Sequence, residues 1–241
     1  MPTETQRLFR RDKDGTIPID ISRNGRHQYS VNGGPLLPST TGILGHLDSD
    51  GFGIGMNWTR KLIRESGDID AAHKASNEAR DLGTAFHASV ESYVKTGFIT
   101  EDPMFSRWLE RCQKHTFFGT EKFVANEKLG YGYGGTIDAL SLETDHRAGK
   151  DVVAVWDWKT KDPDSFNKYG PSKKDFAQVA AYAKALTSLD TVFGPAELGY
   201  IGYVMRDGSA IHVVEVDIEL GWELFQLSHR IHTLMKGGLH D

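Results

Sequence analysis

The stretch DVVAVWDWKT, residues 151–160, constrains the fold more than any other because it joins a long apolar run to a charged end. Its valines and tryptophans are typical of a strand in the middle of a sheet, covered on both faces. Because side chains alternate between the faces of a strand, Asp157 and Lys159 point the same way and Trp158 points the other way. An acid and a base at the end of a buried strand indicate either a salt bridge or a functional site.

The segments around this strand predict an α/β domain with a mixed β-sheet flanked by helices. Residues 27–44 read as a hairpin around Asn32-Gly33 followed by the start of a helix, and residues 56–118 have a helical pattern. The other expected elements are two strands within 120–143 that meet at a Gly-rich bend, a helix within 171–189 entered through Pro171 and Ser172, a hairpin within 198–218 turning at Asp207-Gly208, and a closing helix within 221–238.

Composition excludes several classes of protein. Cys112 is the only cysteine among 241 residues, which excludes an internal disulfide, a thiolate zinc site and a Cys-ligated iron–sulfur cluster. The sequence shows neither a secretory leader nor an apolar run long enough to cross a bilayer, so we expect a cytoplasmic protein without a membrane partner. A net charge of −5 gives no global attraction to nucleic acid, although residues 159–174 are locally basic.

A second carboxylate stands nineteen positions before Asp157, at Asp138 in YGGTIDAL. If the two strands pair, the carboxylates meet at one end of the sheet, where they repel unless a cation lies between them. Hard oxygen ligands with room for water and phosphate suit Mg²⁺ or Mn²⁺. Lys159 would then polarise the attacking water or stabilise the charge that develops on a phosphate. The alternative is a structural Asp157–Lys159 pair, with Asp138 in a turn.

Two further motifs lie on predicted helices. GTAFHASVE places Gly83, His87 and Glu91 at four-residue steps along one helical stripe, where the glycine permits a close approach and His87 with Glu91 offers a ligand and an orienting partner. QVAAY places Gln178 and Tyr182 one turn apart, where they can hydrogen-bond a phosphate or an attacking water. The alternatives are a structural or exposed histidine, a glutamine at the edge of the packing face and a tyrosine in the core.

The order GxxxHxxxE, GxxD, DxK and QxxxY, from Gly83 to Tyr182, resembles the RecB-like branch of the PD-(D/E)xK nuclease superfamily. The resemblance implies a restriction-endonuclease-like core and metal-dependent hydrolysis of DNA phosphodiester bonds. It implies a single nuclease domain over residues 1–241, comprising an N-terminal hairpin region (1–55), a helical part that covers the site (56–118) and the nuclease core (119–241).

The resemblance also implies a role for each matching residue. Mg²⁺ or Mn²⁺, as one or two ions, would be bound by His87, Asp138, Asp157 and the backbone carbonyl of Trp158, with Glu91 supporting these ligands. The catalytic residues would be Asp138, Asp157 and Lys159, together with Gln178 and Tyr182, which would arrange the lysine and the DNA.

With one cysteine, the chain resembles the members without an iron–sulfur cluster, including phage-type and mitochondrial single-strand exonucleases. No GxxxxGK[ST] phosphate loop is present, so a helicase would be a separate chain, as would a single-strand-binding or annealing protein. These relatives imply a role in recombination, repair or replication. The cytoplasm would be that of the host if a phage encodes the chain.

We therefore expect a DNA exonuclease acting on linear DNA, because the helical part can cover the site and no dimerisation element for cutting two strands is evident. The alternatives are a structure-selective endonuclease with the same site and an inactive nuclease-fold module that binds DNA or a partner. Candidate phosphate contacts are Lys161, Lys168, Lys173 and Lys174. Candidate stacking residues, for which core packing is the favoured alternative, are Trp58, Trp108, Tyr131 and Tyr133.

Overall fold

A computed structural model describes residues 3–47, 54–130, 132–145 and 149–236. In chain order, its elements are β1 (Glu4–Asp12), β2 (Gly15–Arg23), β3 (Tyr29–Val31), α1 (Thr40–Leu44), the 3₁₀ turn η1 (Gly45–Leu47), α2 (Ile54–Ser66), α3 (Ala71–Thr96), α4 (Pro103–Cys112), β4 (Thr116–Asn126), β5 (Tyr133–Asp145), β6 (Lys150–Lys161), α5 (Pro163–Tyr169), α6 (Lys173–Ser188), β7 (Ala196–Met205), β8 (Ile211–Glu215) and α7 (Ile218–Lys236).

The central sheet has five strands in the order β4-β5-β6-β7-β8. β6 pairs antiparallel with β5 and parallel with β7, and the other neighbours are antiparallel. Parallel neighbours need a long crossover connection, which α5 and α6 supply between β6 and β7. The expected α/β architecture with a mixed, helix-flanked sheet is therefore confirmed, and the apolar stretch 151–160 forms its middle strand.

The side chains of β6 alternate between two hydrophobic clusters on opposite faces of the sheet. Val153 and Val155 belong to the larger cluster, with α6 and α7, whereas Trp156 and Trp158 belong to the smaller one, with α3 and α4. All four side chains are buried. Because an apolar layer covers each face, β6 needs apolar side chains at odd and even positions, which explains its continuous apolar run.

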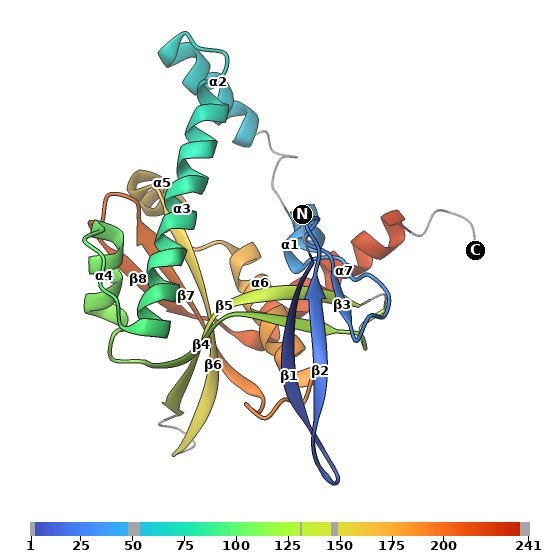
Figure 1. Cartoon of the computed structure of the whole chain (residues 1–241). Helices are drawn as coiled ribbons and strands as arrows, with labels where there is room; N and C mark the ends of the chain where they lie inside the picture. Colours follow the sequence, from blue (N-terminus) through green and yellow to red (C-terminus); the bar gives the residue numbers. More distant parts are fainter. Residues whose placement is uncertain (1–2, 48–53, 131, 146–148, 237–241) are drawn as a thin grey trace.

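The helices divide between the two faces (Figure 1). α6 is buried almost all round because it lies between the sheet and α7. On the opposite face, the C-terminal half of α3 and all of α4 pack on the sheet, through Phe86, Val90 and Trp108. α2 and the first half of α3 extend away from the body of the molecule, so only part of the expected helical cover, residues 56–118, lies near the sheet. None of the described helices is both long enough and apolar enough to cross a membrane.

The N-terminal region contains more sheet than the sequence predicted. Asn32 and Gly33 have positive φ angles of 48° and 71°, and Tyr29 exchanges two backbone hydrogen bonds with Leu37, which confirms a tight turn there. The main hairpin lies earlier, however, where β1 and β2 pair over their full length and β3 adds to β2. The sequence analysis missed it because β1 is largely exposed and carries few apolar side chains that alternate.

Two other boundaries differ from the prediction. Residues 116–118 belong to β4, so the helical part ends with α4. A short helix, α5, follows β6 directly and was not predicted; Asp162 caps it by accepting a hydrogen bond from Ser165 N. The remaining predicted hairpin and helices are present, including the N-cap of α6 at Ser172 and the turn at Gly208. The turn and cap residues of these elements therefore predicted their boundaries correctly.

The close packing of Gly135 on α6 leads to a first prediction. A Cβ atom at position 135 would overlap the ring of Tyr182 and lie 3.0 Å from Thr40 Oγ1. We expect Gly135→Ala to lower the free energy of unfolding by about 1–3 kcal/mol, the usual effect of overfilling a core. Urea denaturation measures the change. The matched control is Gly45→Ala, where an added Cβ meets nothing within 4 Å; equal effects of the two substitutions would contradict the prediction.

Candidate functional site

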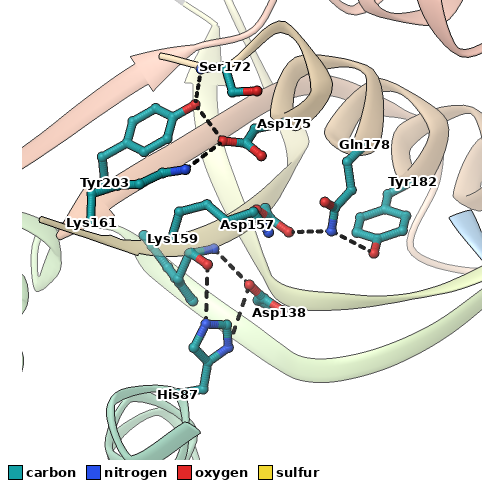
Figure 2. Close-up of polar contacts among 11 residues, drawn as sticks. His87, Asp138, Asp157, Lys159, Lys161, Ser172, Asp175, Gln178, Tyr182 and Tyr203 are labelled. Carbon is teal, nitrogen blue, oxygen red and sulfur yellow. Dashed lines mark hydrogen bonds and ion pairs between the residues drawn. The ribbon is translucent and has the colours of Figure 1, made fainter. Parts of the chain in front are cut away.

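Asp138 and Asp157 lie at the level where β5 and β6 stop pairing. The ladder ends with Ala139 opposite Trp156, so Asp138 is the next residue toward that end on β5 and Asp157 the next on β6. Beyond this point, the backbone N–H of Trp158 donates to Asp138 Oδ2 at 2.7 Å instead of to a strand carbonyl. The fork between the two strands therefore brings together the two carboxylates that the sequence placed nineteen positions apart (Figure 2).

Glu121 on β4 adds a third carboxylate, which the sequence analysis missed. A ligand atom from each of His87, Glu121 and Asp138 lies within 4.8 Å of the other two. The backbone of Glu121 has a positive φ of 50° and is held from β1 by Gln6, whose amide donates to the Glu121 carbonyl at 2.6 Å and accepts from Phe123 N at 3.0 Å. The only sequence signal for Glu121 was its place on the strand before Asp138.

His87 reaches the site from α3, on the other face of the sheet. Its Nε2 is 3.1 Å from the carbonyl oxygen of Trp158, and its Nδ1 is 3.7 Å from Asp138 Oδ2 (Figure 2). Gly83, one turn earlier, makes this approach possible, because a Cβ there would lie 3.3 Å from Thr160 Oγ1. The predicted roles of Gly83 and His87 are thus consistent with the geometry of one helix crossing close to the end of β6.

Lys159 and Asp157 form an ion pair, with Nζ 2.6 Å from Oδ2. The Asp157 side chain is 1% exposed, whereas that of Lys159 is 25% exposed and so reaches the surface of the site. Burial acts to lower the pKa of Lys159, but the charges of Asp157, Asp138 and Asp175 outweigh it and hold the pKa above its ordinary value. Lys159 is therefore a cation at neutral pH.

Gln178 and Tyr182 hold Asp157 from α6. The Gln178 side-chain amide donates to Asp157 Oδ1 and to the hydroxyl of Tyr182, both at 2.9 Å. All three side chains are buried. One oxygen of Asp157 thus contacts Gln178 and the other contacts Lys159, so the QxxxY motif positions the lysine indirectly, through the carboxylate that pairs with it.

When no metal is bound, the environment of the site raises the pKa of two of its carboxyls, those of Glu121 and Asp157. Burial raises the pKa of Glu121 to about 7, with a further contribution from the charge of Asp138. Burial also raises the pKa of Asp157, an effect that Lys159 opposes and Asp138 reinforces. Both shifts have the same cause, which is negative charge gathered out of water.

The predicted DNA contacts separate into two groups. Lys161, on the same face of β6 as Lys159, is 3.5 Å from Asp175, whose carboxylate also accepts a hydrogen bond from the Tyr203 hydroxyl (Figure 2). The others lie further along the chain, with Lys168 on α5 above the ring of Tyr169 and the remaining two at the start of α6 (Lys173 and Lys174). Lys161 is therefore the candidate next to the site.

Several predicted residues have other partners. Glu91 pairs with Lys95 one turn along α3, although its charge also contributes to the raised pKa of Glu121. Trp108 and Tyr133 cannot stack on bases, because both are fully buried in the core; the Tyr133 hydroxyl donates to the Ala181 carbonyl. Of the other stacking candidates, Trp58 lies in α2 and Tyr131 lies outside the described residues.

The donor set fits a small, hard cation with some affinity for nitrogen. His87, Glu121 and Asp138 offer one imidazole and two carboxylates within reach of one point. The Trp158 carbonyl lies beside them, and the charge of Asp138 acts on Asp157 on the next strand. Such a set is typical of Mn²⁺ or Mg²⁺, with Mn²⁺ favoured by the imidazole. The grouping of these three side chains is a feature of the structure.

Comparison with known proteins adds little to this geometry. A scan against protein-family models matched no family, and a search of curated proteins found no relative. Among solved structures, the crystal structure of SSO0001 is similar over 75% of this chain and 71% of its own, with 17% sequence identity and a TM-score of 0.42. A likeness at that level carries no argument about function, so the proposal below depends on the residues of this chain.

The raised pKa of Glu121 leads to a prediction about stability. Below pH 4.5, the ordinary pKa of a glutamate, the carboxyl is mainly protonated in both the folded and the unfolded state. Between pH 4.5 and about pH 7 it ionises more readily in the unfolded state, so the free energy of unfolding falls as the pH rises. At pH 8 in a metal chelator, we expect Glu121→Gln to raise the free energy of unfolding by about 1–3 kcal/mol, allowing for partial exposure. Near pH 5 the gain should be much smaller.

Thermal and urea denaturation at the two pH values measure this difference. The matched control is Glu127→Gln, which removes the same charge from an exposed position just after β4. A Glu121→Gln protein that is less stable than wild type at pH 8 in chelator would show that this carboxylate is held by stabilising partners and is not crowded by like charges.

Proposed function

We propose that this protein is a metal-dependent DNA nuclease with a restriction-endonuclease-like core, and that it acts as an exonuclease on linear DNA. One observation carries the proposal: Glu121, Asp138 and Asp157 from three adjacent strands, with Lys159 and the α3 residue His87, meet at the fork where β5 and β6 stop pairing. The same residues, apart from Glu121, were predicted from the sequence alone. A structural salt bridge would not require three carboxylates and an imidazole at that point.

In this proposal Mn²⁺ or Mg²⁺ is held by His87, Glu121 and Asp138, with Asp157 and the Trp158 carbonyl beside them. The bound metal would supply positive charge to the phosphate and lower the pKa of a water that attacks it. The chain's own contribution is to hold the metal ligands in place before substrate arrives. The Trp158 N–H donates a hydrogen bond to Asp138, and the Gln6 side-chain amide bonds the backbone on both sides of Lys122, an arrangement called here the Gln6 clamp.

Lys159 acts in this scheme as a cation. When no metal is bound, the charges of Asp157, Asp138 and Asp175 hold its pKa above its ordinary value. A partly exposed ammonium beside the carboxylates can donate hydrogen bonds to a non-bridging phosphate oxygen and stabilise the charge that grows there. Asp157 fixes the position of the ammonium, and Gln178 with Tyr182 fixes Asp157. Each motif therefore has a physical task within one network.

Two features support the proposal of DNA as the substrate: the resemblance of the motifs, and the position of Lys161 next to Lys159 on the same face of β6. A structure-selective endonuclease with the same site remains the second candidate. An inactive binding module would ordinarily lack one of the acids or the lysine, and this chain retains all of them.

A lysine substitution tests the proposed chemistry. We expect Lys159→Ala to remove nearly all cleavage while Mn²⁺ still raises the melting temperature, because the side chain acts on the phosphate and is not a ligand. The matched control is Lys150→Ala, at the other end of β6, where the lysine pairs with Glu197. Cleavage by Lys159→Ala at a rate near that of wild type would refute the role of the DxK motif.

Metal titration tests the ligand set. Because the metal binds only the native site, Mn²⁺ at a hundredfold excess over its dissociation constant should stabilise wild type by about 2.7 kcal/mol. We expect higher activity with Mn²⁺ than with Mg²⁺, and a His87→Ala variant that loses most of that advantage. Thermal melts and nuclease assays in each metal measure both effects; equal activity of wild type in the two metals would argue against His87 as a ligand.

The form of the substrate distinguishes exonuclease from endonuclease. End-labelled linear single strands, linear duplexes and closed single-stranded circles are incubated with Mn²⁺, Mg²⁺ or EDTA. We expect linear DNA to be degraded from an end, circles to remain intact and EDTA to stop the reaction. Efficient nicking of circles would favour the endonuclease alternative, and the absence of any metal-dependent cleavage would favour the binding module.

A further inference from the structure

α7 carries a stripe of exposed apolar side chains on the side opposite the core. Its buried positions face the core: Phe225 and His229 contact the ring of Tyr133 on β5. Gly221 packs against α6 so closely that a Cβ there would lie 2.8 Å from Ala180 Cβ. The opposite side exposes Leu227 by 62% and Leu234 by 70%. The full set of exposed large apolar side chains on this helix is Leu220, Leu227, Ile231, Leu234 and Met235. Scattered apolar residues are normal on a surface, but a continuous stripe indicates a contact.

The spacing of the stripe is that of a helix–helix seam. Leu220, Leu227, Ile231 and Leu234 follow one another at intervals of seven, four and three residues. These intervals keep side chains on one side of a helix, as the a and d positions of a heptad repeat do. In that register, Glu223 and Arg230 occupy g positions at one edge of the stripe, and both are exposed. This edge is where charges between paired helices select a partner and its direction.

The charges along α7 are arranged to match a reversed copy of the same helix. Glu219 and Glu223 lie in its N-terminal half, whereas Arg230 and Lys236 lie in its C-terminal half. In a parallel pair, each charge would lie level with the same charge of the other copy. In an antiparallel pair centred on Leu227, the two Leu227 side chains lie across from each other and Leu220 lies across from Leu234. In the same register, Glu223 of each copy lies near Arg230 of the other. The seam and the charges therefore agree on one arrangement.

We propose that α7 is the interface of a homodimer, in which two copies pair antiparallel through this stripe about a two-fold axis. The interface is self-complementary, as a two-fold contact requires, because each half of the helix meets the other half of its partner. It lies on the side of α7 that faces away from α6, and α6 in turn supplies Gln178 and Tyr182 to the candidate site. Each copy in the dimer would thus keep its own candidate site, and α7 would cover neither of them.

This proposal differs from the sequence analysis, which found no dimerisation element. The stripe was overlooked because α7 was read only as the closing helix, and its two apolar sides cannot be told apart until one is seen packed against α6. A helix that is apolar on two sides either lies in the interior or has a second partner. The exposure of Leu227 and Leu234 excludes the interior for the outer side.

Sedimentation equilibrium over a wide range of protein concentration tests the dimer. We expect wild type to pass from monomer to dimer as concentration rises, and Leu227→Glu to raise the dissociation constant at least about tenfold, since it places two charges in the seam. The matched control is Gln226→Glu, which adds the same charge at an exposed neighbouring position off the stripe and should dimerise as wild type does. Because Leu227 is exposed, all three proteins should show the same circular dichroism and melting temperature at low concentration.

A charge exchange tests the antiparallel direction. Glu223→Arg should weaken the dimer by placing like charges together twice, and the double variant Glu223→Arg with Arg230→Glu should restore it. A wild type that is monomeric at every concentration, or a Leu227→Glu protein that dimerises as wild type does, would overturn the interface. A dimer that Glu223→Arg does not weaken would overturn the antiparallel arrangement. None of these outcomes depends on nuclease activity.

Discussion

The structure around the candidate site depends on one electrostatic constraint, which is the gathering of several carboxylates out of water at a fork between strands. Burial raises the pKa of both Glu121 and Asp157, and Asp138 raises each further. Such a group disfavours the folded state in the absence of a cation. The neighbouring polar residues can be understood as the means by which the fold tolerates this charge: an ammonium and an amide at Asp157, and a backbone N–H at Asp138.

These partners come from β6 itself and from α6, and His87 approaches from α3, so the site requires close packing on both faces of the sheet. Gly83 permits α3 to cross the end of β6, and Gly135 permits the ring of Tyr182 to lie on β5. These two glycines are the first residues of the GxxxHxxxE and GxxD motifs. The motif glycines are thus explained by space: a side chain at position 135 would overlap Tyr182 of α6, and one at position 83 would crowd Thr160 where α3 crosses β6.

Features that depend on residues close together in the sequence could be predicted, whereas features that depend on residues far apart in the sequence could not. β6 was evident from its own ten residues, and the positions of Asp157 and Lys159 followed from strand alternation alone. Glu121 was missed because its importance comes from pairing between β4 and β5 and from the Gln6 clamp, which spans 115 residues of sequence. The β1–β2 hairpin was missed for a related reason, since an exposed strand lacks the apolar alternation that identifies a buried one.

α6 connects the two proposals in physical terms. One side of this helix directs Gln178 and Tyr182 toward the acid and lysine of β6, and the other packs against Gly221 at the start of α7. Because α6 is buried almost all round, it cannot shift on one side without disturbing the other. A partner that holds the outer side of α7 would therefore restrain α6 and, through it, the carboxylate that positions Lys159. Dimerisation would in this way limit the motion of the site without contributing a residue to it.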